Sequence, residues 1–329
     1  MKGAKRYRRL LGAIAFLVIV AVIEISLRLG FGLGDPVLLQ AEPDLGYRFQ
    51  PNQSKVRFGR KIAYNQFSQR SDPTTLIKPA GRLRILMTGD SVLNGGAPID
   101  QSQTITALFQ TQLQQAGHAA EVLNASTGSW GIGNVLAYLK RFGTFASDAL
   151  ILEIGNNDLV QPTSTPDRVG RDPDYPDRPP GSAIQEVMGR YLWPSIALRL
   201  GFQPGSTEIP TAVDPVAQLE ANQRDLQQII ALARAQALPI FVVFVPQRYS
   251  LLPALWVSPY KAPIFSILKS LDVPIVDVQQ IWSELPADVI AAYFRDYDHL
   301  TVAGNQAIAT LLFQRICVAK QLPACIPRQ

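Results

Sequence analysis

Cysteine and histidine are scarce in this sequence, which holds two of each among 329 residues. Both cysteines, Cys317 and Cys325, lie close to the C-terminus, and their spacing matches no cysteine pattern that binds metal ions. The sequence therefore gives no reason to expect a metal site built on cysteine. Export of the chain would permit a disulfide between the two thiols, and two buried free thiols are the alternative.

Net charge is also small once the N-terminus is set aside. The formal net charge is +5, and the first nine residues supply five positive charges, from Lys2, Lys5, Arg6, Arg8 and Arg9. The remaining chain balances near zero, so we do not expect a nucleic acid as a partner. The sequence also contains no Gly-rich phosphate loop and no internal repeat. Gly131-x-Gly133 is only a fragment of a dinucleotide fingerprint, because it lacks the third glycine. We expect no cofactor.

What the N-terminus does contain is a long apolar run, Leu10 to Ile23, directly after these basic residues. A membrane-spanning helix needs about 20 mostly apolar residues. The run continues less regularly beyond Ile23, where Glu24 and Arg28 stand four residues apart and can pair near the outer interface. A cleaved signal peptide is the alternative, but no Ala-x-Ala site follows the run. We therefore expect an uncleaved anchor that crosses the membrane once.

These features divide the chain into four parts. Residues 1–9 are expected to form a cytoplasmic tail, residues 10–33 the anchor, and everything after it an extracytoplasmic region. Residues 34–80 are polar and interrupted by proline and glycine, which is typical of a stalk with a few short strands. From residue 81 to 329 apolar runs of strand length alternate with helical periodicity, which predicts an α/β domain. Residues 161–214 lose this rhythm and are interpreted as an insertion beside a functional face.

Five short apolar runs are the expected strands of a parallel sheet. They occupy residues 83–89, 120–126, 149–155, 239–246 and 274–278. The expected helices lie around 105–113 and over 134–145, 215–237 and 301–320, the last with Thr301 as a possible N-cap. Strands this apolar are typical of a sheet that is covered by helices on both faces.

Polar residues follow the first three of these strands and precede the last helix. Ser91 follows the first strand, Gly128 the second and Asn157 the third, while Asp296 and His299 stand just before the final helix. Ligands of an open α/β sheet gather beyond the carboxyl ends of its strands, so we expect these segments to meet there. A serine hydroxyl becomes a nucleophile when an imidazole takes its proton and a carboxylate orients that imidazole. Ser91, His299 and Asp296 are therefore the candidate catalytic residues.

The same edge offers donors for the oxyanion of acyl transfer. These are the backbone N–H groups of Ser91 and Gly128 and the side-chain amide of Asn157, with Gly131 as the alternative glycine. Asp298 is an alternative partner for the imidazole. Asp90 and Asp158 are expected to support the turns beside the site, and paired carboxylates of a glycoside hydrolase are the alternative interpretation of these two residues.

Together, GDS at 89–91, GNND at 155–158 and DYDH at 296–299 resemble blocks of the SGNH (GDSL) hydrolases, in the order and at the strand ends where that family has them. The resemblance covers about residues 82–316, and the stalk resembles those of membrane-anchored bacterial members. It implies a three-layer, flavodoxin-like α/β/α sandwich with a five-stranded parallel sheet in the order 2-1-3-4-5, and ester hydrolysis or acyl transfer without a metal. The second block departs from the family, because Ser129 stands where its glycine is usual.

The resemblance also implies roles for single residues. Ser91 matches the nucleophile, His299 the base, Asp296 its partner and Asn157 an oxyanion donor. We therefore expect a membrane-anchored extracytoplasmic serine esterase that removes acyl groups, acetyl first, from a carbohydrate or a lipid. An acetyltransferase that modifies an exported polysaccharide is one alternative. A catalytically inactive glycan-binding or assembly module is another.

Overall fold

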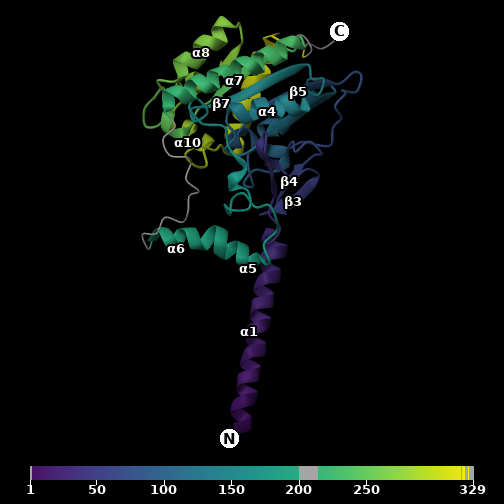
Figure 1. The fold of residues 1–329 in the computed structure, drawn as a ribbon, viewed down its shortest axis with the longest axis vertical. Helices are drawn as coiled ribbons and strands as arrows, with labels where there is room; N and C mark the ends of the chain where they lie inside the picture. Colours follow the sequence, from purple (N-terminus) through teal and green to yellow (C-terminus); the bar gives the residue numbers. More distant parts are fainter. Residues whose placement is uncertain (1, 200–213, 320, 323–324, 326–329) are drawn as a thin grey trace.

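A five-stranded parallel sheet forms the centre of the molecule in the computed structural model, which describes residues 2–199, 214–319, 321–322 and 325 (Figure 1). The strands are β5 (Leu83–Gly89), β6 (Ala120–Ser126), β7 (Ala149–Gly155), β8 (Ile240–Val245) and β9 (Ile275–Asp277). Their order across the sheet is β6-β5-β7-β8-β9, which confirms the expected order 2-1-3-4-5. The first three strands have the bounds that their apolar runs predict, and the last two are shorter at both ends.

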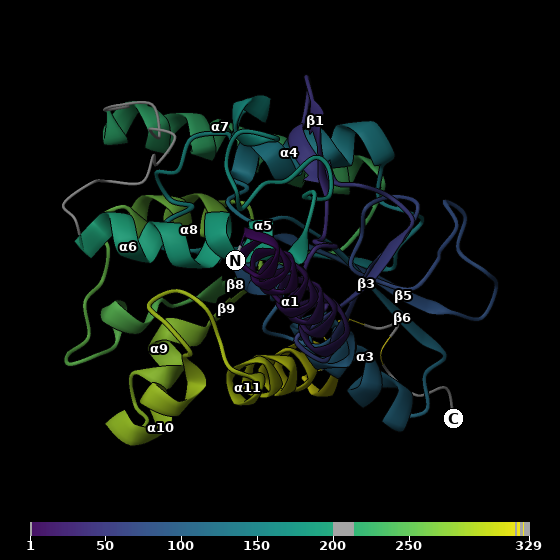
Figure 2. The same ribbon diagram turned by 90° about the horizontal axis from the view of Figure 1, so that it is seen from below.

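Helices cover both faces of this sheet. One face packs against α4 (Ile132–Phe142), α7 (Pro215–Ala235) and α8 (Lys261–Ser270), and the other against α3 (Ile105–Gln115), α9 (Val278–Trp282), α10 (Ala287–Tyr293) and α11 (Val302–Leu312). Alternate residues of β5 contribute to the two cores. Leu86 packs against the first group of helices, and Ile85 and Met87 pack against the second. Figure 2 shows the two helix layers on opposite sides of the strands. The three-layer α/β/α sandwich is thus confirmed.

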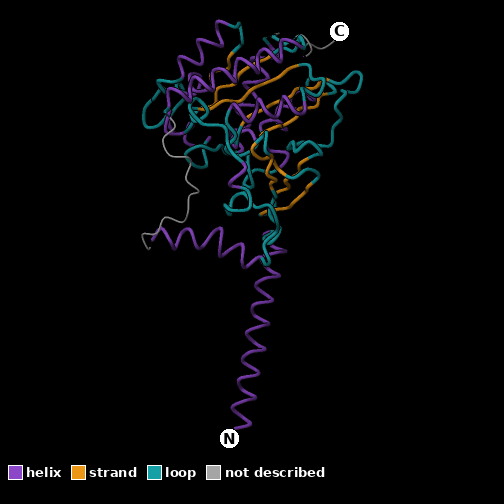
Figure 3. Tube along the Cα trace, viewed as in Figure 1, coloured by secondary structure: helices purple, strands orange, loops and turns teal. Residues whose placement is uncertain are grey.

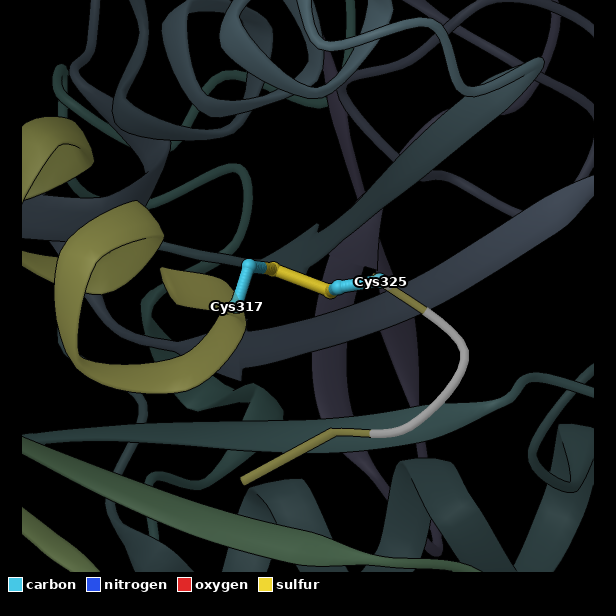
Figure 4. The surroundings of a disulfide bond; sticks show 2 residues. All are labelled: Cys317 and Cys325. Carbon is cyan, nitrogen blue, oxygen red and sulfur yellow. A yellow bond between two sulfur atoms is a disulfide. The ribbon is translucent and has the colours of Figure 1, made fainter. Parts of the chain in front are cut away.

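Capping side chains set where several helices begin. Thr104 Oγ1 accepts a hydrogen bond from the Ala107 N–H at the start of α3, and Asp214 does the same for Val216 in α7. Thr301 caps α11 by accepting from the Gly304 N–H at 3.2 Å, as the sequence predicts. α11 is shorter than expected, because the chain continues from Leu312 as a π-helix, η5 (Phe313–Val318). Cys317, within η5, and Cys325 form a disulfide (Figure 4), which decides between the two alternatives for these thiols.

The N-terminal helix α1 (Lys2–Phe31) projects away from the sheet (Figure 1). Within its segment Arg6–Phe31, an 18-residue stretch has a mean hydropathy of 2.7 and is not buried against the rest of the chain. Length and composition therefore allow α1 to be a membrane anchor or a signal sequence.

Two antiparallel hairpins follow α1. They are β1 (Leu39–Glu42) with β2 (Gly46–Phe49), and β3 (Gln53–Arg57) with β4 (Arg60–Tyr64). Leu45 and Tyr47 are fully buried in the core beside α4, and the Trp130 indole donates a hydrogen bond to the Tyr47 carbonyl at 2.8 Å. This part of the expected stalk therefore packs on the α/β domain and contributes to its core.

The insertion between β7 and α7 contains a helical segment that lies outside the sandwich. It runs through α5 (Ala183–Glu186), a π-helix η3 (Val187–Leu192) and α6 (Trp193–Arg199), and it forms the horizontal helix beside the end of α1 in Figure 3. Residues 200–213 of the insertion lie outside the described residues. The remaining elements are short: α2 (Ser91–Asn94), η1 (Gln101–Gln103), η2 (Pro166–Arg168) and η4 (Arg248–Ser250).

Candidate active site

Ser91 stands at a turn that its neighbours hold tightly. Strand β5 ends at Gly89, and Ser91 is the first residue of α2. The Asp90 carboxylate accepts a hydrogen bond from the Val92 N–H at 2.7 Å and so caps α2. A Cβ at position 89 would overlap the carboxyl of Glu153 on the neighbouring strand, so only glycine permits this close approach. The backbone that presents Ser91 is fixed from both sides.

The three candidate catalytic side chains meet in one hydrogen-bonded chain. His299 Nε2 lies 3.0 Å from Ser91 Oγ. His299 Nδ1 lies 3.0 Å from both carboxylate oxygens of Asp296. This is the geometry in which a base contacts a nucleophile and is itself oriented by a third group. The orienting group is thus the Asp296 carboxylate and not that of Asp298. The backbone N–H of Asp298 donates to Asp296 Oδ1 at 2.9 Å.

Asp296 is held in its ionised form. Partial burial favours the neutral acid, but the N–H groups of His299 and Asp298 and the imidazole outweigh it, and the pKa of Asp296 is lowered. The His299 N–H donates to Asp296 Oδ1 at 2.7 Å, so Asp296 bonds both the backbone and the ring of the same residue. A carboxylate that stays charged near neutral pH can stabilise the imidazolium that forms when the base takes a proton.

Arg295 connects this loop to the turn that carries Ser91. Its guanidinium donates to the Gly95 carbonyl, at the end of α2, with a distance of 3.1 Å. Its Nε also lies 3.3 Å from the Asp296 carboxylate. Burial lowers the pKa of Arg295, and the contact with Asp296 offsets only part of this decrease. Sequence reasoning missed Arg295, because an arginine beside an aspartate in a polar loop is usually solvated.

The proposed oxyanion donors line the same cleft. A Cβ on Gly128 would lie 3.9 Å from the Ser91 Cβ, so these two backbones are neighbours. The Gly128 carbonyl accepts a hydrogen bond from the Tyr47 hydroxyl at 2.8 Å. Gly131 is not in the cleft; it caps α4, and its N–H donates to the Asn134 side chain at 3.0 Å. Asn157 is exposed and contributes to the wall of the cleft.

Buried carboxyl groups lie close to the turn that carries Ser91. Asp158 accepts a hydrogen bond from the Gly155 N–H at 2.7 Å and Glu153 accepts one from the Asp90 N–H at 3.2 Å. Burial raises the pKa of Asp90, and it raises those of Glu153 and Asp158 well above their usual values. Asp90 and Asp158 thus hold the turns of Ser91 and Asn157. Glu153 was missed because it stands inside a run that reads as a buried strand.

One cavity lies over Ser91, and a second cavity adjoins the first. The first, about 460 Å³, is the cleft over the serine, and its lining includes Arg57, Arg190 and Tyr191. The second, about 680 Å³, shares Ser129, Asn157 and Gln161 with the first, and its other residues include three aromatic side chains, Tyr249, Trp256 and Tyr260. Within the described residues, no cluster of three or more metal-ligating side chains has the geometry to hold an ion.

Comparisons with known proteins identify a matching family and several similar solved structures. The model of the GDSL-like lipase/acylhydrolase family matches residues 87–307. Among solved structures, the chain is similar to an acetyl xylan esterase (13% identity, TM-score 0.45, covering 71% of this chain and 100% of the other). It is also similar to an acetyl-xylooligosaccharide esterase from Geobacillus (16%, TM-score 0.44, 73% and 96%). A third is the esterase EstA from Pseudoalteromonas (14%, TM-score 0.42, 73% and 98%).

A search of curated protein sequences found no match to this chain. The family model covers more than half of the sequence and includes both the GDS turn and the loop of His299. The chain belongs to the GDSL-like lipase/acylhydrolase family, whose members include the SGNH esterases.

Proposed function

We propose that this protein is a membrane-anchored extracytoplasmic serine esterase that works through Ser91, His299 and Asp296. The observation that carries the proposal is the continuous contact from Ser91 Oγ through the imidazole to the Asp296 carboxylate, with 3.0 Å at each step. Members of the family that hydrolyse esters need a nucleophile, a base and an orienting acid, and these three residues supply them without a metal or a cofactor.

The reaction follows from this geometry in two halves. His299 Nε2 takes the proton of Ser91 Oγ, which attacks the ester carbonyl and forms a tetrahedral oxyanion. The backbone N–H groups of Ser91 and Gly128 and the amide of Asn157 stabilise that oxyanion. The imidazolium, stabilised by Asp296, returns its proton to the departing alcohol and leaves an acyl group on Ser91. Water then attacks the acyl-enzyme while His299 takes its proton, and the imidazolium returns that proton to Ser91 Oγ as the acid is released.

Three features support an anchored protein with its domain outside the membrane. The basic residues before the apolar run favour a cytoplasmic N-terminus. Helix α1 extends away from the domain with its apolar side chains exposed. The Cys317–Cys325 disulfide is typical of proteins that fold in an oxidising compartment.

The second cavity supports an acetylated carbohydrate as the substrate. Tyr249 and Trp256 lie with their ring centroids 5.7 Å apart at its wall, both partly exposed. Flat aromatic faces suit the C–H faces of sugar rings, while the cavity's arginine and asparagine side chains can bond hydroxyl groups. Because this cavity shares Asn157 with the catalytic cleft, a sugar bound there would bring an ester on a neighbouring position close to Ser91.

The test is ester hydrolysis by the full chain in detergent or nanodiscs. Purified protein should release acetate from p-nitrophenyl acetate and from an acetylated xylo-oligosaccharide. His299→Gln should abolish both activities, and His118→Gln, a change of the other histidine, should leave them unchanged. Loss of the acetyl group only when an acceptor glycan is present, with no free acetate, would replace the esterase by a transferase. Hydrolysis that survives His299→Gln would contradict the mechanism.

A further inference from the structure

The helical segment formed by α5, η3 and α6 has an unusual position in the molecule. It leaves the domain beside the C-terminal end of α1 and runs crosswise to α1, clear of the sandwich (Figure 1). Its residues belong to the insertion, and none of its described residues takes part in either hydrophobic core. Something other than sheet packing must therefore account for its apolar composition.

One face of this segment is apolar and exposed. Met188, Leu192, Trp193 and Ile196 each expose between 42% and 55% of their surface. Met188, Leu192 and Ile196 recur at intervals of four residues, which places them along one side of the helix. Soluble proteins rarely leave such a contiguous apolar stripe in water, so this face is expected to have an occupant.

The opposite face holds the segment against the domain. Glu186 forms a buried ion pair with Arg57 of β3 and accepts a hydrogen bond from the Gly34 N–H at 2.6 Å. Arg190 lies 2.9 Å from Asp174 and about one helical turn after Glu186. Met188 falls midway between these two anchoring residues and therefore points to the other side. Leu192 and Ile196 follow Met188 at intervals of four, so this row faces away from the contacts with the domain, and Trp193 adjoins Leu192 at the edge of the row.

The start of the segment is bonded to α1 itself. The Ala183 and Ile184 N–H groups donate to the two carboxylate oxygens of Glu24, at 2.7 and 3.0 Å. Arg28 in turn lies 2.6 Å from the same carboxylate. These contacts satisfy N–H groups that an isolated helix end leaves unpaired. They also fix where the segment stands along α1.

That position is the outer edge of the apolar span. With a rise of about 1.5 Å per residue, about 20 residues cross a hydrocarbon layer of about 30 Å. Counted from Arg9, such a layer ends close to Leu29. Glu24 and Arg28 thus belong to the last turns of the span, where the bilayer changes from hydrocarbon to head groups.

We propose that the segment Ala183–Arg199 lies along the outer surface of the membrane that α1 crosses, with Met188, Leu192, Trp193 and Ile196 inserted between the lipid head groups. This inference rests on the proposed anchoring by α1. Lipid is the occupant because the stripe starts at the end of the span, runs parallel to the membrane plane and faces away from the domain. Tryptophan favours that layer, and Arg199 at the far end suits lipid phosphates.

The placement has a consequence for the active site. Arg190 and Arg57, which hold the segment to the domain, also line the cleft over Ser91. The membrane-bound segment therefore contributes Arg190 to the lining of the cleft over Ser91. The cleft is held at the membrane surface and receives esters presented there.

Tryptophan quenching by brominated lipid tests this placement without measuring activity. The full chain is reconstituted in bilayers of phosphatidylcholine or of its brominated form. Trp130 and Trp282 are buried at 2% exposure, so the exposed Trp193 and Trp256 are the ones that lipid can reach. We expect brominated lipid to lower the emission of the wild type. Trp193→Phe should remove that difference, and Trp256→Phe, which alters a similarly exposed indole in the second cavity, should retain it.

Equal quenching of Trp193→Phe and the wild type would overturn the proposal. Carbonate extraction of the same membranes separates this failure from a failure of the anchor. A chain that carbonate releases is not anchored, whereas a retained chain with unquenched Trp193 has its segment elsewhere. Unquenched Trp193 together with cross-linked dimers that Leu192→Arg abolishes would assign the stripe to a second copy of the chain instead.

Discussion

His299 Nε2 lies 3.0 Å from Ser91 Oγ, although 208 residues separate them in the sequence. Ser91 is placed by the end of β5, and His299 by the loop between α10 and α11. Arg295 joins the two segments through the Gly95 carbonyl. The candidate site therefore depends on the complete sandwich, because neither segment could hold the pair at this distance by itself.

Asp296→Asn should lower kcat by about 10²- to 10⁴-fold with little change in KM, because an amide cannot stabilise the imidazolium or select its tautomer. Asp298→Asn is the matched control, since Asp298 contributes only its backbone N–H to the network. Its kcat should stay within about threefold of the wild type. Steady-state hydrolysis of p-nitrophenyl acetate measures both. The account of the orienting role fails if the two variants lose activity equally.

Asn157→Ala should lower kcat by about 10²- to 10³-fold, the usual cost of removing one oxyanion donor. The substitution weakens the transition state and not the binding of the substrate, because the negative charge on the carbonyl oxygen develops only as Ser91 attacks. KM should therefore change little. A variant with wild-type kcat would show that the donors come from the backbone alone.

Glu153→Gln should change how stability depends on pH. Burial, with Asp90 and Asp158 nearby, raises the pKa of Glu153 well above its ordinary value of 4.5. The folded chain then keeps a proton that the unfolded chain loses, so the free energy of unfolding falls as pH rises above that ordinary value. Glutamine removes this proton and can still accept the Asp90 N–H.

Denaturant unfolding at about pH 5 and about pH 8 measures the effect. The wild type should lose more stability than Glu153→Gln between the two conditions. Asp158 contributes a decrease of the same sign in both proteins, because burial raises its pKa as well. Equal losses in the two proteins would mean that Glu153 titrates normally.

Trp256→Ala should raise KM for an acetylated xylo-oligosaccharide by about tenfold, the loss expected for a ring worth about 1.4 kcal/mol of binding. The same variant should hydrolyse p-nitrophenyl acetate with unchanged kcat/KM, because that ester is small enough to occupy the catalytic cleft alone. Initial rates on the two substrates give the comparison. Parallel changes on both substrates would argue against a sugar site in the second cavity.

The sheet could be predicted from the sequence because its strands are buried on both faces. A run such as 149–155 is almost purely apolar, and its bounds can be read directly. The candidate catalytic residues could be predicted from the sequence for a related reason. Parallel strands place the residues that follow them at one edge, so Ser91 and Asn157 had to be neighbours once the strands were known. Asp296 and His299 stood out because the chain holds only two histidines.

Other parts of the fold depend on contacts that no local pattern reveals. Leu45 and Tyr47 are isolated apolar residues in a polar stretch, and only the position of α4 makes them part of the core. Glu153 is a charged residue inside an apolar strand, and only its close contacts with Gly89 and the Asp90 N–H explain its position. Arg190 stands in the insertion, 99 residues after Ser91 by number, yet it lines the same cleft.

Labelling with a fluorophosphonate tests the central claim most directly, because this reagent forms a covalent bond with a serine that an imidazole has activated. The full chain should be labelled on the peptide that contains Ser91, and Ser91→Ala should take up no label. Ser270→Ala, a change on the distant helix α8, should be labelled like the wild type. Label that persists in Ser91→Ala, or a wild type that takes up none, would contradict the mechanism.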